Sequence, residues 1–484
     1  MSRTVRHIVR GMRSRERRNA VESGAGKGAD LRLMRELNRR LILNCVRERG
    51  PIARVAIARQ TGLSRTTVGT IVDDLLNDGL VREGATQITA RSGGRPAILV
   101  HFNASAGSIL GLDMGRSHLT ILLSDLAANI LARRSGPFDA SLGPDECLPW
   151  VVRELRDFLV EQHVSWNRVV GIGVGMPGPM DANVHRTIAP PRMPGWGNVD
   201  VGGRLSRELG VPVYVDNDAN MGALGESWYG AGSGVRDLIY IKIGTGIGAG
   251  LITSGHIYRG SRGSAGEIGH VTFDESGPVC DCGNRGCLET FASAPAIVED
   301  AIHAASLRAA DPQASATALP ALANTPHPDI ADVVQAARDG DCACVAALRR
   351  AGERIGIVVA GLVNLINPSA ILIGGGVAQA GGLLLDPIRS AVNARTFSVA
   401  SQDLRIEQGA LGDNAVGYGG IATVIDAAFG VTSTSASGRA LGVGTKVAEI
   451  DAARGETGGD FTPGVSTLLT HAAAAPPAAV EDSS

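Results

Sequence analysis

The sequence predicts an α/β fold of two lobes, preceded by a smaller α+β module. From about Gly107 to about Gly430, short apolar strands alternate with glycine-rich turns and helices, as in α/β proteins. Two strand–glycine–strand hairpins occupy corresponding places in the two halves of this region, which indicates a duplicated fold with a cleft between its lobes. Residues 31–102 have a basic, helical pattern instead. We therefore expect one domain at residues 31–102 and a two-lobed domain at residues 105–430.

The two ends of the chain have a biased composition. The first eighteen residues carry seven arginines and one acid, although the whole chain has a formal net charge of only -2. Residues 1–30 are expected to be a basic disordered arm, which is either solvated or turned toward a nucleic acid; a mitochondrial presequence is a weaker alternative. Residues 431–484 are rich in Ala, Ser, Thr and Gly, and this composition predicts a disordered, low-complexity tail.

Apolar segments and cysteines bear on where the protein works. The sequence has no apolar run long enough to span a membrane and no apolar core of a signal peptide. Its cysteines are clustered at spacings typical of metal ligands rather than of disulfides, and such sites suit a reducing compartment. We expect a cytoplasmic protein without a membrane partner.

A helix-turn-helix is predicted at residues 38–79. Asn38–Arg49 and Arg54–Thr61 read as helices, and Ser64 is placed to cap a third helix that ends at Gly79. The apolar residues of the third helix recur at helical spacing and would be buried. Its opposite, N-terminal face would read the major groove of DNA with four side chains: Arg65, Thr66, Thr67 and Thr70.

The segment after this helix resembles a hairpin with a basic tip. Arg91 and Arg95 flank Ser92-Gly93-Gly94, and arginines next to glycines can enter a narrow minor groove. The whole segment is thus predicted to be a winged helix-turn-helix. The alternative is a helical module for dimerisation or linkage, in which the basic tip would have no packing purpose. Because winged modules usually bind operators as dimers, we expect a homodimer or homotetramer.

Three glycine clusters are candidates for binding a nucleotide. The first turn joins strands at Ile109–Asp113 and Ser117–Ser124; the second, Gly244–Gly250, lies between strands at Leu238–Ile243 and Leu251–Thr253; the third follows a strand at Ala370–Ile373. Glycines let backbone N–H groups approach phosphate oxygens. If a nucleotide is bound, the candidate residues are Asp113, Gly115, Gly244, Thr245, Gly246, Gly248 and Gly375.

Polar residues end a strand between the two hairpins. The strand Val213–Val215 leads into Asp216-Asn217-Asp218 at the start of a helix. Ligands of open α/β sheets gather at such strand ends. A carboxylate there can accept a proton from a sugar hydroxyl, and a neighbouring amide can hold other hydroxyls. The alternative is that Asp218 is a helix N-cap.

One imidazole and three thiols lie within eighteen residues: His270, Cys280, Cys282 and Cys287. Three Cys and one His make up a closed, tetrahedral, structural zinc site, and the glycines around them allow the tight loop that such a site needs. A chance cluster is the alternative, but the Cys-x-Cys spacing with a third Cys close behind argues against it. The sequence therefore predicts a structural Zn²⁺.

These motifs together resemble the ROK family (repressors, uncharacterised reading frames and sugar kinases), over about Leu31 to Gly430. The segment 266–270 is similar to the family's E-x-G-H element, and 280–289 to its C-x-C-G-x-x-G-C-x-E signature. The resemblance implies a two-lobed actin-like or hexokinase-like ATPase fold and the zinc ligands named above. It implies that Asp218 is the catalytic base if the protein is a kinase. It also implies a sugar site formed by Gly178, Asn217, Asp218, Glu267, His270 and Glu289.

One departure from the family pattern bears on function. The kinases carry D-x-G-G-T in the first hairpin, but this chain has Asp113-Met114-Gly115-Arg116-Ser117. Arg116 brings a long side chain to a turn where glycine permits close phosphate approach. We therefore expect a sugar-responsive, DNA-binding regulator, most simply a repressor, with operator DNA and a sugar or sugar derivative as partners. The alternatives are a hexose or amino-sugar kinase that uses ATP and Mg²⁺, and an interaction protein controlled by a phosphotransfer partner.

Overall fold

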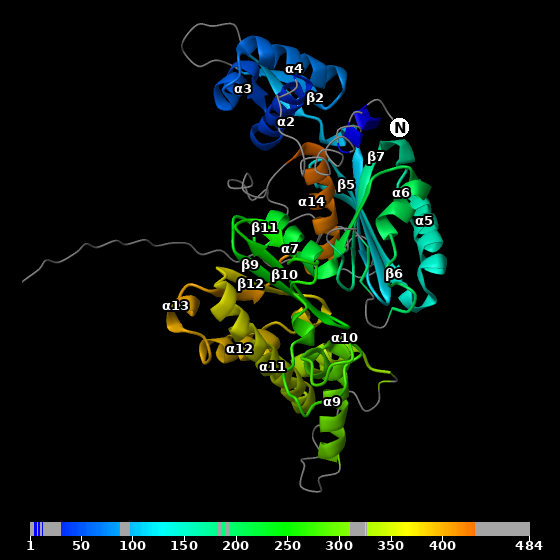
Figure 1. Cartoon of the computed structure of the whole chain (residues 1–484), viewed down its shortest axis with the longest axis vertical. Coiled ribbons are helices and arrows are strands. Elements are labelled where there is room, and N and C mark those ends of the chain that lie inside the picture. The colour runs from blue at the N-terminus through cyan, green and yellow to red at the C-terminus, as the bar shows by residue number, and fades with distance from the viewer. Residues whose placement is uncertain are drawn as a thin grey trace, which may run out of the picture. The chain divides into compact units, whose positions relative to one another are not determined.

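The computed structural model describes residues 4–6, 8–9, 12, 31–87, 97–181, 186–188, 193–309, 325 and 327–430 (Figure 1). The tail expected at residues 431–484 lies outside the described residues.

The start of the chain differs from the expected disordered arm. Residues 4–6, 8–9 and 12 are helical, and Val5, Ile8, Val9 and Met12 are buried. The physical reason is their spacing of i, i+3, i+4 and i+7, which gives a helix one apolar face despite the many arginines. The other residues of the expected arm lie outside the described residues.

The helix-turn-helix has the predicted elements. The helix predicted at Arg54–Thr61 is confirmed, Gly62 adopts a positive φ of 70° in the turn after it, and the Ser64 side chain accepts a hydrogen bond from the Thr67 N–H. The preceding helix is longer than predicted. A three-stranded antiparallel sheet of order β1-β3-β2 completes the module. Its elements are α2 (Leu31–Arg49), β1 (Ile52–Ala53), α3 (Arg54–Thr61), α4 (Arg65–Asn77), β2 (Val81–Gln87) and β3 (Ala97–Phe102).

The first lobe is a five-stranded sheet of order β6-β5-β4-β7-β8, in which β7 and β8 run parallel to β4 and the hairpin strands are antiparallel. Short 3-10 helices flank it: η1 (Ala104–Ala106), η2 (Ala140–Leu142) and η3 (Trp166–Arg168). Its other elements are β4 (Ser108–Met114), β5 (His118–Asp125), β6 (Ile130–Pro137), α5 (Pro144–Glu161), β7 (Val169–Met176), α6 (Val201–Leu209), β8 (Val213–Asn217) and α7 (Asp218–Tyr229).

The second lobe repeats this topology with the order β11-β10-β9-β12-β13, which confirms the duplicated, two-lobed fold. Its strands are β9 (Leu238–Ile243), β10 (Ile247–Thr253), β11 (His256–Tyr258), β12 (Ala370–Gly374) and β13 (Arg405–Gln408). Its helices are η4 (Ile268–His270), α8 (Glu289–Ala292), α9 (Ala294–Ala309), α10 (Ile330–Arg338), α11 (Cys342–Ile366), η6 (Gly376–Ala380), α12 (Gly382–Asn393), α13 (Ser398–Ser401), η7 (Gly412–Asn414) and α14 (Ala415–Phe429).

The second hairpin turn is shorter than predicted. It spans only Gly244–Gly246, and β10 already begins at Ile247, so Gly248 and Gly250 belong to a strand. Helix α7 explains the glycine at 250, because a Cβ there would collide with the carbonyl oxygen of Ala219. Glycines in this stretch therefore serve helix packing as well as the turn.

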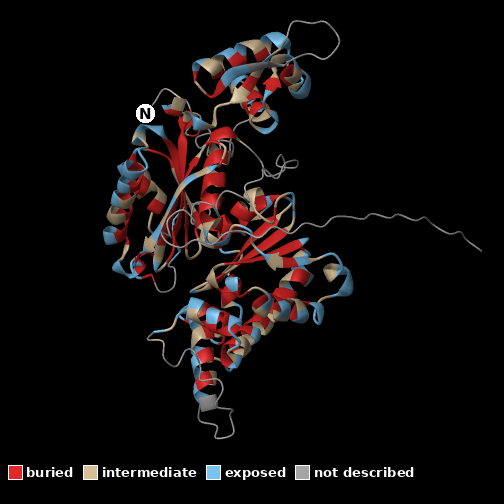
Figure 2. Ribbon diagram, turned by 180° about the vertical axis from the view of Figure 1, so that it is seen from behind, coloured by how far each residue is buried: buried red, intermediate tan, exposed pale blue. Residues whose placement is uncertain are grey.

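Helices α7 and α14 are equivalent elements of the two halves, and they lie between the two sheets (Figure 1). They approach each other closely, since a Cβ on Gly419 would collide with the Met221 carbonyl and one on Gly225 with that of Ala415. Helices α5 and α6 cover the other face of the first sheet, and α9 to α12 cover that of the second. Figure 2 shows that both sheets and both central helices are largely buried.

Candidate functional site

A cavity of about 400 Å³ is lined by residues of both lobes. Both hairpin turns, the start of α7, the end of η4 and the start of α14 contribute to its wall. All candidate residues for the sugar and the nucleotide line this one cavity: Asp113, Gly115, Gly178, Asn217, Asp218, Gly244, Thr245, Gly246, Gly248, Glu267, His270, Glu289 and Gly375. The fold thus brings together residues that are up to 262 positions apart (113 to 375), while their individual roles stay predictions.

Asn217 fixes the end of β8 against a neighbouring loop. Its Oδ1 accepts hydrogen bonds from the N–H groups of Ala219 at 2.9 Å and Asn220 at 3.2 Å, so Asn217 is the N-cap of α7. Its Nδ2 donates to the carbonyl oxygen of Gly178 at 3.1 Å. Gly178 has a φ of 87°, a conformation that favours glycine. One amide therefore joins the predicted sugar loop to the start of α7.

Asp218 is left to face the cavity because Asn217 takes the capping position. Its Oδ1 accepts only the N–H of Ala219, at 2.9 Å, while Oδ2 lies 2.9 Å from Nζ of Lys242 on β9. The Asp218 side chain is 16% exposed. A carboxylate held in this way can accept hydrogen bonds from a sugar hydroxyl.

Two glutamates complete the acidic wall. Burial, with the nearby charges of Asp218 and Glu289, raises the pKa of Glu267 to about 7. Glu289 begins α8, and its Oε2 accepts a hydrogen bond of 3.0 Å from the N–H of Ile247 at the start of β10. Five carboxylates line the same cavity, since Asp113 and Asp413 join Asp218, Glu267 and Glu289, and such a lining suits a ligand rich in hydroxyl donors.

The predicted metal ligands form one cluster. The candidate ligand atoms of His270, Cys280, Cys282 and Cys287 all lie within 4.8 Å of one another. Nδ1 of His270 is 3.6 Å from Sγ of Cys280, and Sγ of Cys282 is 3.7 Å from Sγ of Cys287. The number and kind of these donors fit a tetrahedral metal ion. Because His270 also lines the cavity, with its Nδ1 turned to a thiol, this cluster and the cavity share one side chain.

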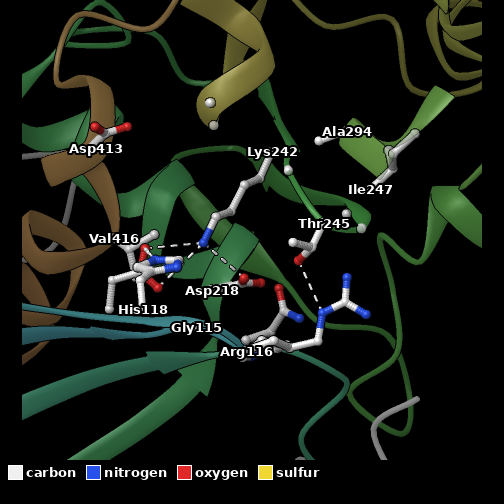
Figure 3. Close-up of a pocket in the computed structure, with 18 of the residues that line it drawn as sticks. Gly115, Arg116, His118, Asp218, Lys242, Thr245, Ile247, Ala294, Asp413 and Val416 are labelled. Atoms are coloured by element: carbon white, nitrogen blue, oxygen red, sulfur yellow. Dashed lines mark hydrogen bonds and ion pairs between the residues drawn. The ribbon is translucent and has the colours of Figure 1, made fainter. Parts of the chain in front are cut away.

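Four basic side chains in the cavity were not predicted as members of the site: Arg116 was seen only as a departure from the family pattern, and His118, Arg133 and Lys242 were not singled out. Figure 3 shows Lys242 extending to Asp218, and Arg116 meeting Thr245 from the opposite hairpin. Lys242 had a signal in the sequence, since it is the one charged residue in the apolar strand LIYIKI. A charge in a buried strand next to a glycine turn is a reason to expect a partner there.

The predicted DNA-reading face lies at the start of α4. Arg65, Thr66 and Thr70 are exposed, and Thr67 is half-buried. The hydroxyl of Thr67 lies 2.8 Å from that of Ser64, and the hydroxyl of Thr70 donates to the Thr66 carbonyl at 3.1 Å. Arg65 and the Thr66 hydroxyl are therefore the groups most available to a base edge. Arg91 and Arg95, predicted for the minor groove, lie outside the described residues.

Within the part of the chain that the structure describes, no helix is long and apolar enough to cross a membrane.

Comparisons with known proteins agree with this geometry. The family model "ROK family" matches residues 109–427, and the model "Winged helix-turn-helix DNA-binding" matches residues 35–82. A xylose repressor of Caldicellulosiruptor bescii is 34% identical over 398 residues, which cover 81% of this chain and 96% of that protein.

Solved structures resemble this chain over different lengths. A ROK family transcriptional regulator, described as a homologue of the E. coli Mlc protein, has a TM-score of 0.69 at 29% identity, covering 82% of this chain and 97% of its own. A glucokinase from Streptomyces griseus, crystallised with glucose and AMPPNP, has a TM-score of 0.58 at 28% identity and covers 66% of this chain and 99% of its own. The likeness to the regulator therefore extends over more of this chain than the likeness to the kinase.

Proposed function

This chain belongs to the ROK family and carries a winged helix-turn-helix domain, and we propose that it is a sugar-responsive transcriptional repressor. In this proposal a sugar or sugar derivative binds in the cavity, and operator DNA binds at α4 and the wing. The protein acts in the cytoplasm as a homodimer or homotetramer, because operators are usually read by two copies of such a module. The regulators among its relatives support the proposal.

The observation that carries the proposal is the position of α14. Val416, in its first turn, lines the cavity, and Phe429, its last residue, contacts the winged module. The Phe429 carbonyl accepts a hydrogen bond of 3.1 Å from Asn44 on α2, and its ring packs edge-on against Phe102 on β3 at 6.1 Å. A single helix thus touches both the proposed sugar site and the DNA-binding domain.

Helix α7 makes a second connection of the same kind. It begins with Asp218 in the cavity and ends with Tyr229, whose ring lies 5.4 Å from that of Tyr418 on α14. Arg47 of α2 is a neighbour of Tyr229: burial lowers the pKa of the Arg47 guanidinium, and Tyr229 partly offsets that shift. A sugar that shifts α7 or α14 would therefore change the contacts that these helices make with α2. The recognition helix, which packs on α2, would then be placed differently. Such coupling requires the sugar to bind the two states with different free energies.

We further propose that the cluster of three cysteines and His270 holds a structural zinc ion. Zinc, when bound, would supply a rigid tetrahedral anchor. The loop that it anchors runs from His270 to Cys287, and Glu289 follows two residues later. The shape of the sugar site would then depend on the metal without the metal touching the sugar.

Kinase activity is the second candidate, because the turn Gly244–Gly246 and Asp218 are present and a glucokinase shares the fold. The basic side chains in the cavity argue against it. A kinase needs room for triphosphate oxygens at the first turn, where this chain places Arg116. ADP release with ATP, Mg²⁺ and a panel of hexoses and amino sugars tests this directly: turnover lost in Asp218→Asn would establish a kinase.

The repressor proposal is tested with an operator selected from random duplex DNA by the purified, zinc-loaded protein itself. Fluorescence anisotropy then measures operator affinity with and without each sugar of the panel. We expect one sugar class to change operator affinity at least about tenfold, in line with typical coupling energies, and Asp218→Asn to abolish the change while operator binding without sugar persists. If a sugar binds by calorimetry and leaves operator affinity unaltered, the proposal is wrong.

Arg65→Ala supplies the matching test of the DNA face. Loss of an arginine that reads a base edge should weaken operator binding by about 1–3 kcal/mol and relax preference at one base position. Arg153→Ala, which removes an exposed arginine on α5 of the first lobe, is the control and should bind as the wild type does. Equal losses of operator affinity in both variants would show that the effect comes from the protein's overall positive charge and not from a contact with a base.

A further inference from the structure

Lys242 lies between two carboxylates that come from different elements of the first lobe. Its Nζ is 2.9 Å from Oδ2 of Asp218, at the start of α7, and 3.2 Å from Oδ2 of Asp113, near the end of β4. The three side chains are only 16%, 16% and 6% exposed. Lys242 itself belongs to β9 of the second lobe, so this ion-pair cluster connects the two lobes across the cavity (Figure 3).

The place that the ammonium occupies has the chemistry of a divalent-cation site. Two carboxylates converge there, beside the two glycine turns whose N–H groups would approach phosphates. In phosphoryl transfer, Mg²⁺ is held by one or two carboxylates and by phosphate oxygens. Here a fixed positive charge already stands between the carboxylates. A divalent ion at the same place would lie within a few ångströms of the ammonium, and the repulsion would be strong at a site with little solvent.

Two neighbouring basic groups also disfavour a divalent metal ion at this place. Nε2 of His118 lies 3.3 Å from Oδ2 of Asp113, the oxygen that Lys242 also contacts, so two basic groups share this carboxylate. Nε of Arg116 donates a hydrogen bond of 3.0 Å to Oγ1 of Thr245, so the turn of the first lobe is joined to the turn of the second where phosphates would pass. Both carboxylates and both turns are thus engaged by the chain's own side chains.

We propose that Lys242 is a built-in cation that takes the place of a divalent metal, and that it restricts this cavity to a sugar ligand without metal–nucleotide. In that arrangement Asp218 is a hydrogen-bond acceptor for the sugar rather than a base, because one of its oxygens is committed to the ammonium. Lys242 and Arg116 also hold the two lobes together in the absence of a nucleotide. The part of this inference that concerns the sugar rests on the proposed function. The part that concerns exclusion of the metal does not.

The test is Mn²⁺ binding to the full-length, zinc-loaded protein, followed by the electron paramagnetic resonance signal of free Mn²⁺. Wild-type protein should show no Mn²⁺ site that depends on Asp113. Lys242→Ser should bind Mn²⁺ at least about tenfold more tightly than the wild type, because the competing charge is gone, and Asp113→Asn in that background should remove the gain. Lys242→Gln, which keeps most of the side-chain length without its charge, is the second variant should the serine variant not fold.

Two results would overturn the inference. One is a Mn²⁺ site in the wild-type protein that Asp113→Asn abolishes. This result can be obtained without any variant at position 242. The other is a folded, neutral variant at position 242 that gains no Mn²⁺ binding. Neither measurement involves sugar or DNA, so either result leaves the repressor proposal standing. A bound sugar that fails to alter operator affinity would disprove the repressor proposal but would not affect the Mn²⁺ result.

Discussion

The side-chain amide of Asn44 donates a hydrogen bond of 3.1 Å to the backbone carbonyl of Phe429, the last residue of α14. The carbonyls at the end of a helix have no partner within it, so an amide from another element can satisfy one of them. Here that amide belongs to α2 of the winged module. The helix that starts at the cavity is therefore fixed, at its other end, to the domain that carries the recognition helix.

Replacing Asn44 by alanine should uncouple sugar binding from DNA binding. A hydrogen bond of this kind contributes about 1 kcal/mol, so the sugar-induced change in operator affinity should shrink about fivefold. Sugar binding to the DNA-free protein should stay nearly unchanged, because Asn44 does not line the cavity. Anisotropy with operator DNA and calorimetry with sugar measure the two quantities.

The control for this prediction is Asn364→Ala. Asn364 on α11 makes an equivalent hydrogen bond, from Nδ2 to the carbonyl of Arg395 at 3.3 Å, away from both the cavity and the winged module. It should leave the sugar response intact. An Asn44→Ala protein with a full sugar response would show that α14 does not transmit the signal through this contact.

Removal of the metal should weaken sugar binding. In Cys282→Ser the cluster keeps two thiols and one imidazole, so zinc should be lost to a chelator that the wild type resists. Because the loop positions His270 and Glu289, sugar affinity should fall about tenfold or more. Elemental analysis gives the zinc content, with about one ion per chain expected for wild type, and calorimetry gives the sugar affinity.

Cys342→Ser is the matched control, since Cys342 is also an exposed, free cysteine but lies at the start of α11 outside the cluster. It should retain zinc and bind sugar normally. Should Cys282→Ser lose its zinc and still bind sugar with wild-type affinity, the metal would have no part in shaping the sugar site.

Local patterns allowed much of this structure to be predicted. The helix Arg54–Thr61, the cap at Ser64 and the two glycine hairpins depend on neighbours in the sequence, and each lies where expected or within a few residues. The clustering of His270 with Cys280, Cys282 and Cys287 was predictable for the same reason, because all four lie within one short loop. Among the local predictions that failed were the length of the second turn, where Gly250 makes room for helix α7, and the disordered start of the chain, where Val5, Ile8, Val9 and Met12 are buried.

The role of Lys242 could not be predicted in this way. Its partners lie 24 and 129 positions away, and they meet it only because β9 pairs in the second sheet while α7 and β4 place their carboxylates in the first lobe. Asp218 was expected in the sugar site and Asp113 among the nucleotide candidates, as if no cation stood between them. A lysine in an apolar strand signals that some partner exists, but not which one.

Replacing Lys242 by methionine should destabilise the protein most at neutral pH. Burial alone would raise the pKa of Asp113, but Lys242 and then His118 hold it below its ordinary value. Wild-type Asp113 therefore adds stability above that ordinary pKa and loses it only as the pH falls through the lowered one.

In Lys242→Met burial dominates and raises the pKa of Asp113, so the stability of the variant falls as the pH rises through the raised value. The deficit should be about 3 kcal/mol near pH 7 and should shrink steadily toward about pH 5. Urea unfolding across this range measures it.

Adding Asp113→Asn to Lys242→Met should recover part of the stability at neutral pH, because a neutral amide needs no counter-charge. Arg405→Met is the control for a loss of positive charge: its pair with Glu407 has side chains 50% and 39% exposed, and such pairs contribute little. Its stability should follow that of the wild type at every pH. A Lys242→Met deficit that did not vary with pH would mean that the lysine acts by packing alone, and the view of Lys242 as the counter-charge of two buried carboxylates would have to be given up.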